Sequence, residues 1–564
     1  MRIHPSDQCK LSGDIESEHS SSGVIDNRTI LKGARCFIKE RTWSTDLAVL
    51  ATLVAIALAL RLTMFSGFVL GDDPAYAWYT SQILQGSGYP HFSKYSVFLA
   101  RPLLLYMAAL SIYLFGWQEW SFVLPILLSS LINTVLVYLI ARELGGRRVG
   151  ALSAIAYIFF PLDIVHSTTF TNDIPLSTFI WGGAFLLLIA LNSRFCGKSL
   201  LAFVSGMIVG LGVAIKPNAL AAGPLFAFGA FLTSVLRRRQ MPQPYWLPSA
   251  AWSLGWAITN LALCLFVKIH SGSFWGQIET ELRFNLDLDP SALKASGISI
   301  PDFLLLYPKW ILGLAREGHP PYTFMPYGYF FIFFFACTLL APWRQFAALR
   351  LPLIWAFSFF LILEFTPITL TPRYIPLHRL PRFLHLISIP AAICIGITFA
   401  TVVQSRIATA RALGIVAYSF LLASSIYWAH RKWAFYNDCL SDQRWAWQQI
   451  QYLSCEQIVT DPELAAFLHF KSGYTLANKI NSPLSVPSQL PPGVLLITGG
   501  ARRPDLEPAF AQRWRRPFQD LPPDWLHIAT FERPMTPWRT TKMEIYRVLP
   551  QTVQQSRSAR CLDR

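Results

Sequence analysis

Long apolar segments with almost no charge recur from about residue 47 to residue 428. Crossing a bilayer takes about 20 consecutive apolar residues, and most of these segments reach that length or come close to it. Only 14% of the residues are charged, whereas soluble domains carry about a quarter. The chain of 564 residues is therefore predicted to be an all-α polytopic membrane protein.

Lysine and arginine set the predicted topology, because they concentrate in cytoplasmic loops. The net charge of +16 fits this bias. Nucleic-acid binding is not expected, since the basic runs are short loops between apolar segments. Four basic residues (Lys32, Arg35, Lys39 and Arg41) precede the first span at 47–70. Residues 1–46 are thus expected to form a cytoplasmic tail, and no signal peptide is evident.

The apolar segment 98–116 decides how many times the chain crosses. If this segment spanned the bilayer, the basic clusters at 142–148 and 237–239 would face outward. If it lies along the outer surface as an interfacial helix, both clusters fall inside. We therefore expect about eleven transmembrane helices in a domain at 47–428. The first outer loop is then 71–121, with the N-terminus inside and the C-terminus outside.

Residues 429–564 are expected to form a small soluble α/β domain on the outer, periplasmic side. Gln457 to Pro462 is typical of a strand that leads into a helix at Glu463–Phe470, and Val494–Thr498 of a second strand. The nine cysteines show no metal-like spacing; Cys439 and Cys455 lie in this region, where a disulfide is possible. No cofactor or metal ligand is predicted. The lack of glycosylation acceptors in the outer segments favours a bacterial inner membrane.

This topology gathers polar residues on the outer face of the membrane. A carboxylate can act as general base toward a hydroxyl group, and arginine holds phosphate through two hydrogen bonds. Together they suit group transfer from a lipid-phosphate donor at the membrane surface. The residues are Asp72, Asp73, Arg101, Asp163, His166, Asn172, Asp173, Lys216, Asn218, Arg373, His378, Arg379 and Arg382.

Each of these residues also has a purely structural interpretation. Asp73 and Asp173 precede Pro74 and Ile174-Pro175 and are plausible helix N-caps. Arg101 is a plausible lipid headgroup anchor, and Lys216 could extend from the end of a span toward water. Histidines at such positions are more often satisfied interfacial residues than catalysts. The shared location of the set, rather than any one member, favours a functional site.

Several short motifs follow one another in a specific order along about residues 45–480. The segments are Gly71-Asp72-Asp73-Pro74-Ala75-Tyr76, Arg101-Pro102, Ala141-Arg142-Glu143-Leu144-Gly145-Gly146, Phe170-Thr171-Asn172-Asp173, Gly210 to Pro217, Arg382-Phe383 with Pro390, and Thr460-Asp461-Pro462. In their order and spacing these motifs resemble those of the GT-C glycosyltransferases, in particular the protein O-mannosyltransferase and aminoarabinose-transferase-like branch.

The resemblance implies transfer of a monosaccharide, a hexose or a pentose, from a polyprenyl-phosphate donor to an acceptor on the outer side, with inversion. Asp72 or Asp73 would be the acceptor base or its orienter, with Asp173 in support. Arg101 would bind the donor phosphate, with Lys216 and Arg382 as further candidates. The acceptor would be a lipid, glycan or protein, and no nucleotide site is expected. Asp72-Asp73 stands where many members have Asp-Glu, which leaves the identity of the base open.

Two other classes of function remain compatible with the sequence. A transporter or lipid flippase fits the spans and the basic loops, although transporters keep ionisable groups near the membrane midplane. Here the middles of the expected spans are nearly free of charge, with Glu364 as an exception near a span end. A catalytically inactive relative is the second alternative.

Overall fold

The computed structural model describes most of the chain from residue 43 onward. The described residues are 43–69, 71–86, 88–92, 97–192, 197–236, 246–287, 305–316, 323–340, 346–369, 375–376, 380–453, 457–482, 490–499, 525–536 and 539–549. The chain divides into two units, Met1–Val49 and Leu50–Arg564. Of the first unit, only the beginning of one helix is described, so the expected cytoplasmic tail lies almost wholly outside the described residues.

Helices dominate the described part of the chain. Eight helical stretches in it are long and apolar enough to cross a membrane, and three shorter apolar helices accompany them. The eight contain α2 (Trp43–Thr63), α5 (Glu119–Gly145), α8 (Asp173–Asn192), α10 (Ala222–Leu236), α11 (Leu247–Ser271), α17 (Phe346–Phe365), α18 (His385–Val403) and α19 (Ala408–Tyr452); the shorter three are α4 (Pro102–Phe115), α9 (Lys198–Val213) and α16 (Phe330–Leu340). The predicted polytopic all-α membrane fold is confirmed.

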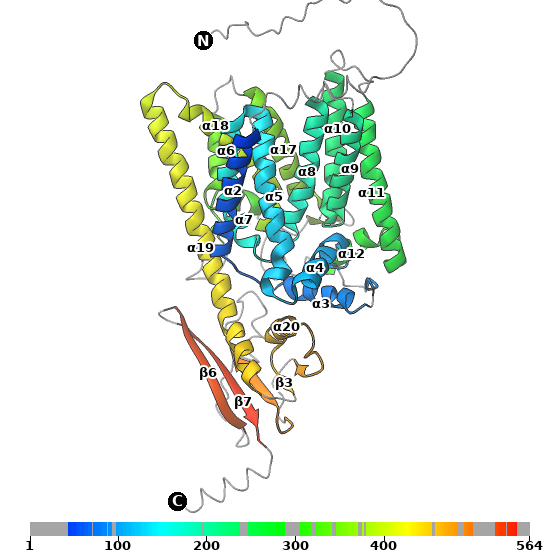
Figure 1. The fold of residues 1–564 in the computed structure, drawn as a ribbon, viewed down its shortest axis with the longest axis vertical. Helices are drawn as coiled ribbons and strands as arrows, with labels where there is room; N and C mark the ends of the chain where they lie inside the picture. The colour runs from blue at the N-terminus through cyan, green and yellow to red at the C-terminus, as the bar shows by residue number, and fades with distance from the viewer. Residues whose placement is uncertain are drawn as a thin grey trace, which may run out of the picture. The chain divides into compact units, whose positions relative to one another are not determined.

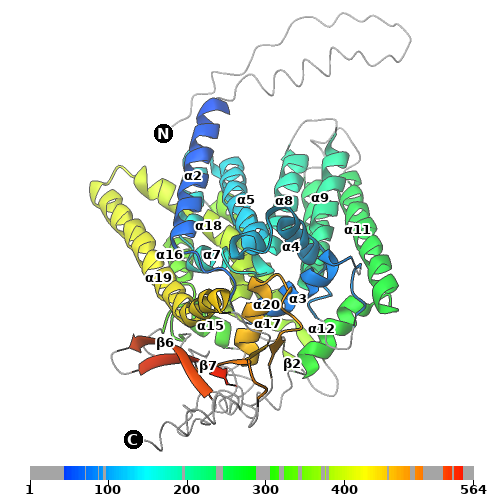
Figure 2. The same cartoon turned by 60° about the horizontal axis from the view of Figure 1, so that its bottom comes forward.

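Short helices connect the long ones. These are α3 (Asp73–Leu84), α6 (Arg147–Ile158), α7 (Pro161–His166), α12 (Gly276–Asp287) and α15 (Leu306–Ile311), with 3-10 turns η1 (Pro217–Ala221) and η4 (Pro381–Leu384). In both cartoon views α3, α4 and α12 gather at one end of the long helices, on the side of α20 (Pro462–Lys471) (Figures 1 and 2). The segments that carry the candidate site therefore meet at one end of the helical bundle.

Helix α4 corresponds to the segment that we expected to lie along the membrane surface. It starts at Pro102 and ends before Gly116, and its 14 residues rise about 21 Å, which is short of a hydrocarbon core of about 30 Å. One side of the helix is buried against the protein, while Tyr106, Leu110 and Tyr113 are exposed. An apolar helix with one such exposed stripe suits the interfacial position, which stays a prediction.

Glycine allows α9 and α11 to pack at very short range. A Cβ atom at Gly206 would clash with the backbone carbonyl of Trp252, and one at Gly255 would clash with that of Phe203. Small residues let helix backbones approach closely in a membrane, where association depends on packing rather than on the hydrophobic effect. This contact fixes α11 against α9 and so orients α12, which follows α11.

The last membrane helix continues into the C-terminal region without a break. α19 has 45 residues, and about 20 residues suffice to cross a bilayer, so roughly half of the helix extends beyond it. The expected domain boundary at residue 429 therefore falls inside a helix rather than in a linker. The division into domains at 1–46, 47–428 and 429–564 stays a prediction.

A small mixed sheet follows α19. Strands β3 (Ile458–Val459), β4 (Ile480–Asn481) and β5 (Leu495–Gly499) pair in parallel through β3, and the hairpin β6 (Trp525–Thr536) and β7 (Arg539–Val548) adds antiparallel strands in the order β4-β3-β5-β7-β6. Asp461 caps α20 by accepting hydrogen bonds from the backbone of Glu463 and Leu464. The predicted strands and helix of a small C-terminal α/β region are confirmed. The side chain of Cys439 and all of Cys455 lie outside the described part.

The C-terminal region is joined to the segment between α2 and α3 and to the start of α5 by aromatic and charged contacts. Phe470 of α20 stacks on Phe68 with ring centroids 4.3 Å apart and contacts Phe122 of α5 at 5.3 Å. Glu119, at the start of α5, pairs with Arg444 at 2.8 Å and with Lys471 at 3.4 Å. These contacts link α19 and α20 to the loop that carries Asp72.

A buried ionic network crosses the helical bundle. Arg61 of α2 pairs with Asp163 of α7, and both side chains are 0% exposed. Ser130 donates to Asp163 at 2.5 Å, and Tyr157 donates to it at 2.8 Å. His385 Nε2 lies 2.8 Å from the same carboxylate. Arg61 lies in the last turn of α2, so this buried charge sits near a helix end, where Asp163 compensates it.

Candidate active site

Asp72 lies at the N-cap of α3 and pairs with Arg382 of η4. Gly71, with φ at 135°, adopts a backbone conformation that side-chain-bearing residues avoid, and it turns the chain into α3. Arg382 donates to Asp72 at 2.6 Å, and the side chain of Asp72 is 33% exposed. Burial raises the pKa of Asp72, but Arg382, Arg101 and Lys216 outweigh it, so the net pKa lies below the ordinary value.

Asp73 has a different environment. It is only 5% exposed and accepts hydrogen bonds from the backbone N–H of Val69 at 2.9 Å and of Phe170 at 3.5 Å. Burial raises the pKa of Asp73 well above its ordinary value, and Asp72 adds to the shift. The expected N-cap role of Asp73 was wrong, because α3 begins at Asp73 and its cap position is Asp72. Asp73 instead links the start of α3 to the segment just before α8.

Asp173 begins α8 and forms an ion pair with Lys216, which lies in the turn between α9 and η1. Lys216 Nζ is 2.6 Å from Asp173 Oδ1, and both side chains are nearly fully buried. The ammonium group also lies 3.5 Å from the ring centroid of Phe383, a cation–π contact. Burial lowers the pKa of Lys216 to about 8, although Asp173 opposes the shift.

Arg101 is buried immediately before α4 and connects two helices. It donates to the hydroxyl group of Tyr76 on α3 and, at 3.0 Å, to Glu281 on α12. Tyr76 packs edge-on against Phe98, with ring centroids 5.0 Å apart. Tyr76 and Glu281 thus fix the position of Arg101 from two sides. A residue that only contacted lipid headgroups would not need to be fixed in this way.

The six predicted site residues therefore converge. Arg382 Nε lies 3.6 Å from Asp173 Oδ2, which joins the Asp72 pair to the Lys216 pair. Arg101 and Lys216 both lower the pKa of Asp72. Among the described residues, the buried atoms Arg101 Nε, Arg382 Nε and Asp173 Oδ2 have no hydrogen-bond partner. Two buried guanidinium N–H groups without an acceptor suit an anionic ligand.

The remaining polar residues that were expected on the outer face separate into groups. Asp163 belongs to the buried network with Arg61. His166 is buried, and its Nε2 lies 3.0 Å from Lys432 Nζ of α19. Asn172 is buried beside Asp173. Arg373, His378 and Arg379 lie outside the described residues, so the structure gives no position for them.

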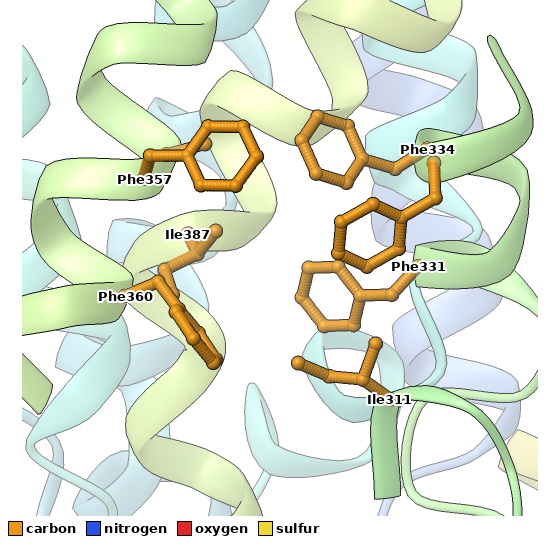
Figure 3. Close-up of a pocket in the computed structure, with 8 residues that line it drawn as sticks. Ile311, Phe331, Phe334, Phe357, Phe360 and Ile387 are labelled. Carbon is orange, nitrogen blue, oxygen red and sulfur yellow. The ribbon is translucent and has the colours of Figure 1, made fainter. Parts of the chain in front are cut away.

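An apolar pocket lies beside the start of α18. Figure 3 shows Phe331 and Phe334 of α16 on one side, with Phe357 and Phe360 of α17 and Ile387 of α18 opposite them. Ile311, Phe335 and Ala356 complete the lining. Ile387 lies five positions after Arg382 in the sequence, so one short segment contributes to both the charged cluster and the apolar pocket.

Two members of the cluster were not predicted as site residues. Tyr76 was part of a quoted motif, and its spacing of four from Asp72 places both on one helix face, which could have identified it. Glu281 carried no such signal, because it lies 180 positions from Arg101 in a loop without a motif. Within the described residues no group of three or more His, Cys, Asp or Glu side chains is arranged to hold a metal ion.

Comparison with known proteins identifies the class of fold. Residues 100–263 match the model of a family described as dolichyl-phosphate-mannose-protein mannosyltransferase. This segment contains Arg101, Asp173 and Lys216, while Asp72 and Arg382 lie on either side of it. No curated protein matches the sequence significantly.

Two solved structures extend the comparison to most of the chain. The crystal structure of ArnT from Cupriavidus metallidurans bound to undecaprenyl phosphate is 14% identical, has a TM-score of 0.51, and covers 88% of this chain and 97% of that chain. The apo form of ArnT covers 89% of this chain and 98% of that chain, with 14% identity and a TM-score of 0.50. The chain is an integral membrane protein with the GT-C fold of membrane glycosyltransferases, and the resemblance noted from its motifs is confirmed.

Proposed function

We propose that this protein is a glycosyltransferase that moves a monosaccharide, a hexose or a pentose, from a polyprenyl-phosphate donor to a hydroxyl or phosphate acceptor on the outer face of a bacterial inner membrane. The observation that carries the proposal is the cluster of Asp72, Asp173, Arg101, Lys216 and Arg382. The apolar pocket, to which Ile387 contributes five positions after Arg382, supports the choice of a lipid-linked donor.

The donor phosphate is proposed to bind among Arg101, Lys216 and Arg382. Arg101 and Arg382 each keep a buried Nε–H that donates no hydrogen bond, and arginine engages phosphate through two parallel hydrogen bonds. The polyprenyl chain would leave along the pocket lined by Phe331 and Phe357. ArnT, which shares the fold, was crystallised with undecaprenyl phosphate, a lipid of this chemical class.

Asp72, rather than Asp73, is proposed as the general base. Its side chain is 33% exposed, whereas Asp73 is buried and bonded to two backbone N–H groups. The acceptor hydroxyl gives its proton to Asp72 while its oxygen attacks the anomeric carbon on the face opposite the phosphate. The bond from that carbon to the phosphate oxygen breaks, and the leaving phosphate keeps the electron pair and the three cations stabilise its charge.

Arg382 is proposed to couple donor binding to the basicity of Asp72. In the ligand-free structure the guanidinium lowers the pKa of this carboxyl, which weakens it as a base. A donor phosphate on Arg382 offsets part of that positive charge, so the basicity of Asp72 rises when the donor is bound. Asp173 is proposed to hold Lys216 in place and to support the acceptor.

The test is release of polyprenyl phosphate by the purified full-length protein, supplied with a polyprenyl-phosphate sugar and a panel of lipid, glycan and peptide acceptors. The proposal expects release that depends on the acceptor and is lost in Asp72→Asn. A phosphate acceptor is already ionised, so Asp72→Asn would then retain most of the activity. Translocation of the intact donor across proteoliposomes without release would overturn the proposal in favour of a flippase. Binding of the donor with neither release nor translocation would indicate an inactive relative.

A further inference from the structure

Helix α12 contacts the phosphate-binding residues proposed above through one of its faces. Gln277, Thr280 and Glu281 have the spacing of three and four residues that places side chains on the same side of a helix. Gln277 and Thr280 are buried and Glu281 is 18% exposed. The helix therefore meets the core of the outer face with polar rather than apolar side chains.

Gln277 joins two segments that are distant in sequence. Its Nε2 donates to the backbone carbonyl of Ala100 at 2.6 Å and to that of Val213 at 2.8 Å. Ala100 immediately precedes Arg101, and Val213 lies three residues before Lys216. Both donor hydrogens of the Gln277 amide are thus used to hold together the two segments that present Arg101 and Lys216.

Glu281 acts on Arg101 directly. It accepts a hydrogen bond from the guanidinium at 3.0 Å, while Tyr76 accepts another from the opposite terminal nitrogen. With both terminal nitrogens occupied, the guanidinium plane is fixed and its buried Nε–H remains without a partner. A fixed plane is what arginine needs to meet a phosphate with two aligned hydrogen bonds.

We infer that α12 is the positioning element of the donor-phosphate site, with Gln277 and Glu281 as its positioning residues. This inference rests on the proposed function. Gln277 sets the separation between Arg101 and Lys216, and Glu281 sets the orientation of Arg101. Neither side chain needs to contact the substrate.

The experiment measures binding of undecaprenyl phosphate to the purified full-length protein in nanodiscs, together with its thermal unfolding. Gln277→Met keeps the volume of the side chain and removes both hydrogen bonds, and Glu281→Ala removes the contact with Arg101. Each is expected to raise the Kd about five- to tenfold, the effect of losing one or two hydrogen bonds. Glu281→Gln keeps an acceptor oxygen within reach of Arg101 and loses the negative charge, so it is expected to bind as tightly as the wild type or more tightly.

Glu279 provides the matched control, since it lies on the same helix and accepts its hydrogen bond from Ser273 instead. Glu279→Gln is expected to leave the Kd unchanged. Equal Kd values for the wild type, Gln277→Met and Glu281→Ala would overturn the inference and leave the proposed function standing. A wild type that does not bind undecaprenyl phosphate would overturn the proposed function itself. Equal losses in Glu281→Gln and Glu281→Ala would show that the charge, and not the positioning, matters.

Discussion

Two neighbouring carboxyl groups differ because their surroundings differ. Asp72 faces Arg382 and is partly exposed, so its charged form is favoured. Asp73 is enclosed, and burial with Asp72 beside it favours its neutral form. Asp72 can therefore accept a proton from a substrate, whereas Asp73 mainly accepts hydrogen bonds from the backbone.

Substitution of each carboxyl by its amide separates these roles. Asp72→Asn is expected to lower turnover by about 10²- to 10⁴-fold, the usual contribution of a general base, with little change in the unfolding temperature. Asp73→Asn resembles the neutral acid and keeps an acceptor oxygen, so turnover is expected to stay within a fewfold of wild type. Steady-state kinetics on both variants checks this, and the opposite ranking would assign the base to Asp73.

The Lys216 ammonium should make donor binding depend on pH. Its pKa is lowered to about 8, so the side chain is charged below that pH and loses its proton as the pH rises through it. The KM for the donor is expected to rise between pH 7 and pH 9.5. Lys216→Arg stays charged over this range and should flatten the profile; a wild-type KM that does not change with pH would contradict the proposed role.

At the scale of elements, the start of α18 is held by the buried network around Asp163. His385, the first residue of α18, meets Asp163 of α7 and also lies 3.1 Å from Ser177 of α8. Arg382 and Phe383 are on the turn just before it. The network therefore fixes the segment whose side chains contact Asp72 and Lys216.

Loss of the Asp163 charge tests this role. Asp163→Asn leaves Arg61 buried without a counter-charge and is expected to destabilise the protein by about 3–5 kcal/mol. The double variant Arg61→Met, Asp163→Leu removes both charges and should recover part of that loss. Thermal or denaturant unfolding of the purified protein measures both, and a single variant as stable as wild type would show that the pair contributes little.

The sequence predicted elements more completely than contacts. The apolar segments predicted a polytopic helical fold, and the expected common side of the membrane predicted that Asp72, Asp173, Arg101, Lys216 and Arg382 would meet. Those signals are local or follow from topology. The pairing of Arg101 with Glu281 depends on how α12 packs, and no local pattern encodes that packing. Arg61 could have been noticed, since a charge inside a span needs a partner.

At the scale of the whole molecule, the C-terminal region and the helical bundle share one aromatic contact zone. Phe470 of α20 lies against Phe68 and Phe122, and Phe122 stacks on Phe170 with centroids 4.2 Å apart. Phe170 in turn contacts Tyr76. A continuous path of packed rings thus runs from the C-terminal region to the partner of Arg101.

Removal of Phe470 is expected to weaken this zone. The side chain is fully buried, and Phe470→Ala should cost about 3–5 kcal/mol and lower turnover together with stability. Tyr452→Ala serves as the control, because that residue of α19 is 85% exposed. Thermal unfolding combined with limited proteolysis checks the prediction, and unchanged protease resistance in Phe470→Ala would mean that the charged contacts of Glu119 suffice.

The three ion pairs of the site also bear on which lipids it rejects. Arg101 with Glu281, Lys216 with Asp173 and Arg382 with Asp72 contribute three positive and three negative charges, so these pairs carry no excess of either sign. A membrane surrounds the protein with anionic phospholipids, and an uncompensated trio of cations would attract their headgroups indiscriminately. A cluster without net charge binds such headgroups only weakly. Only a ligand that satisfies the fixed guanidinium geometry gains enough to bind.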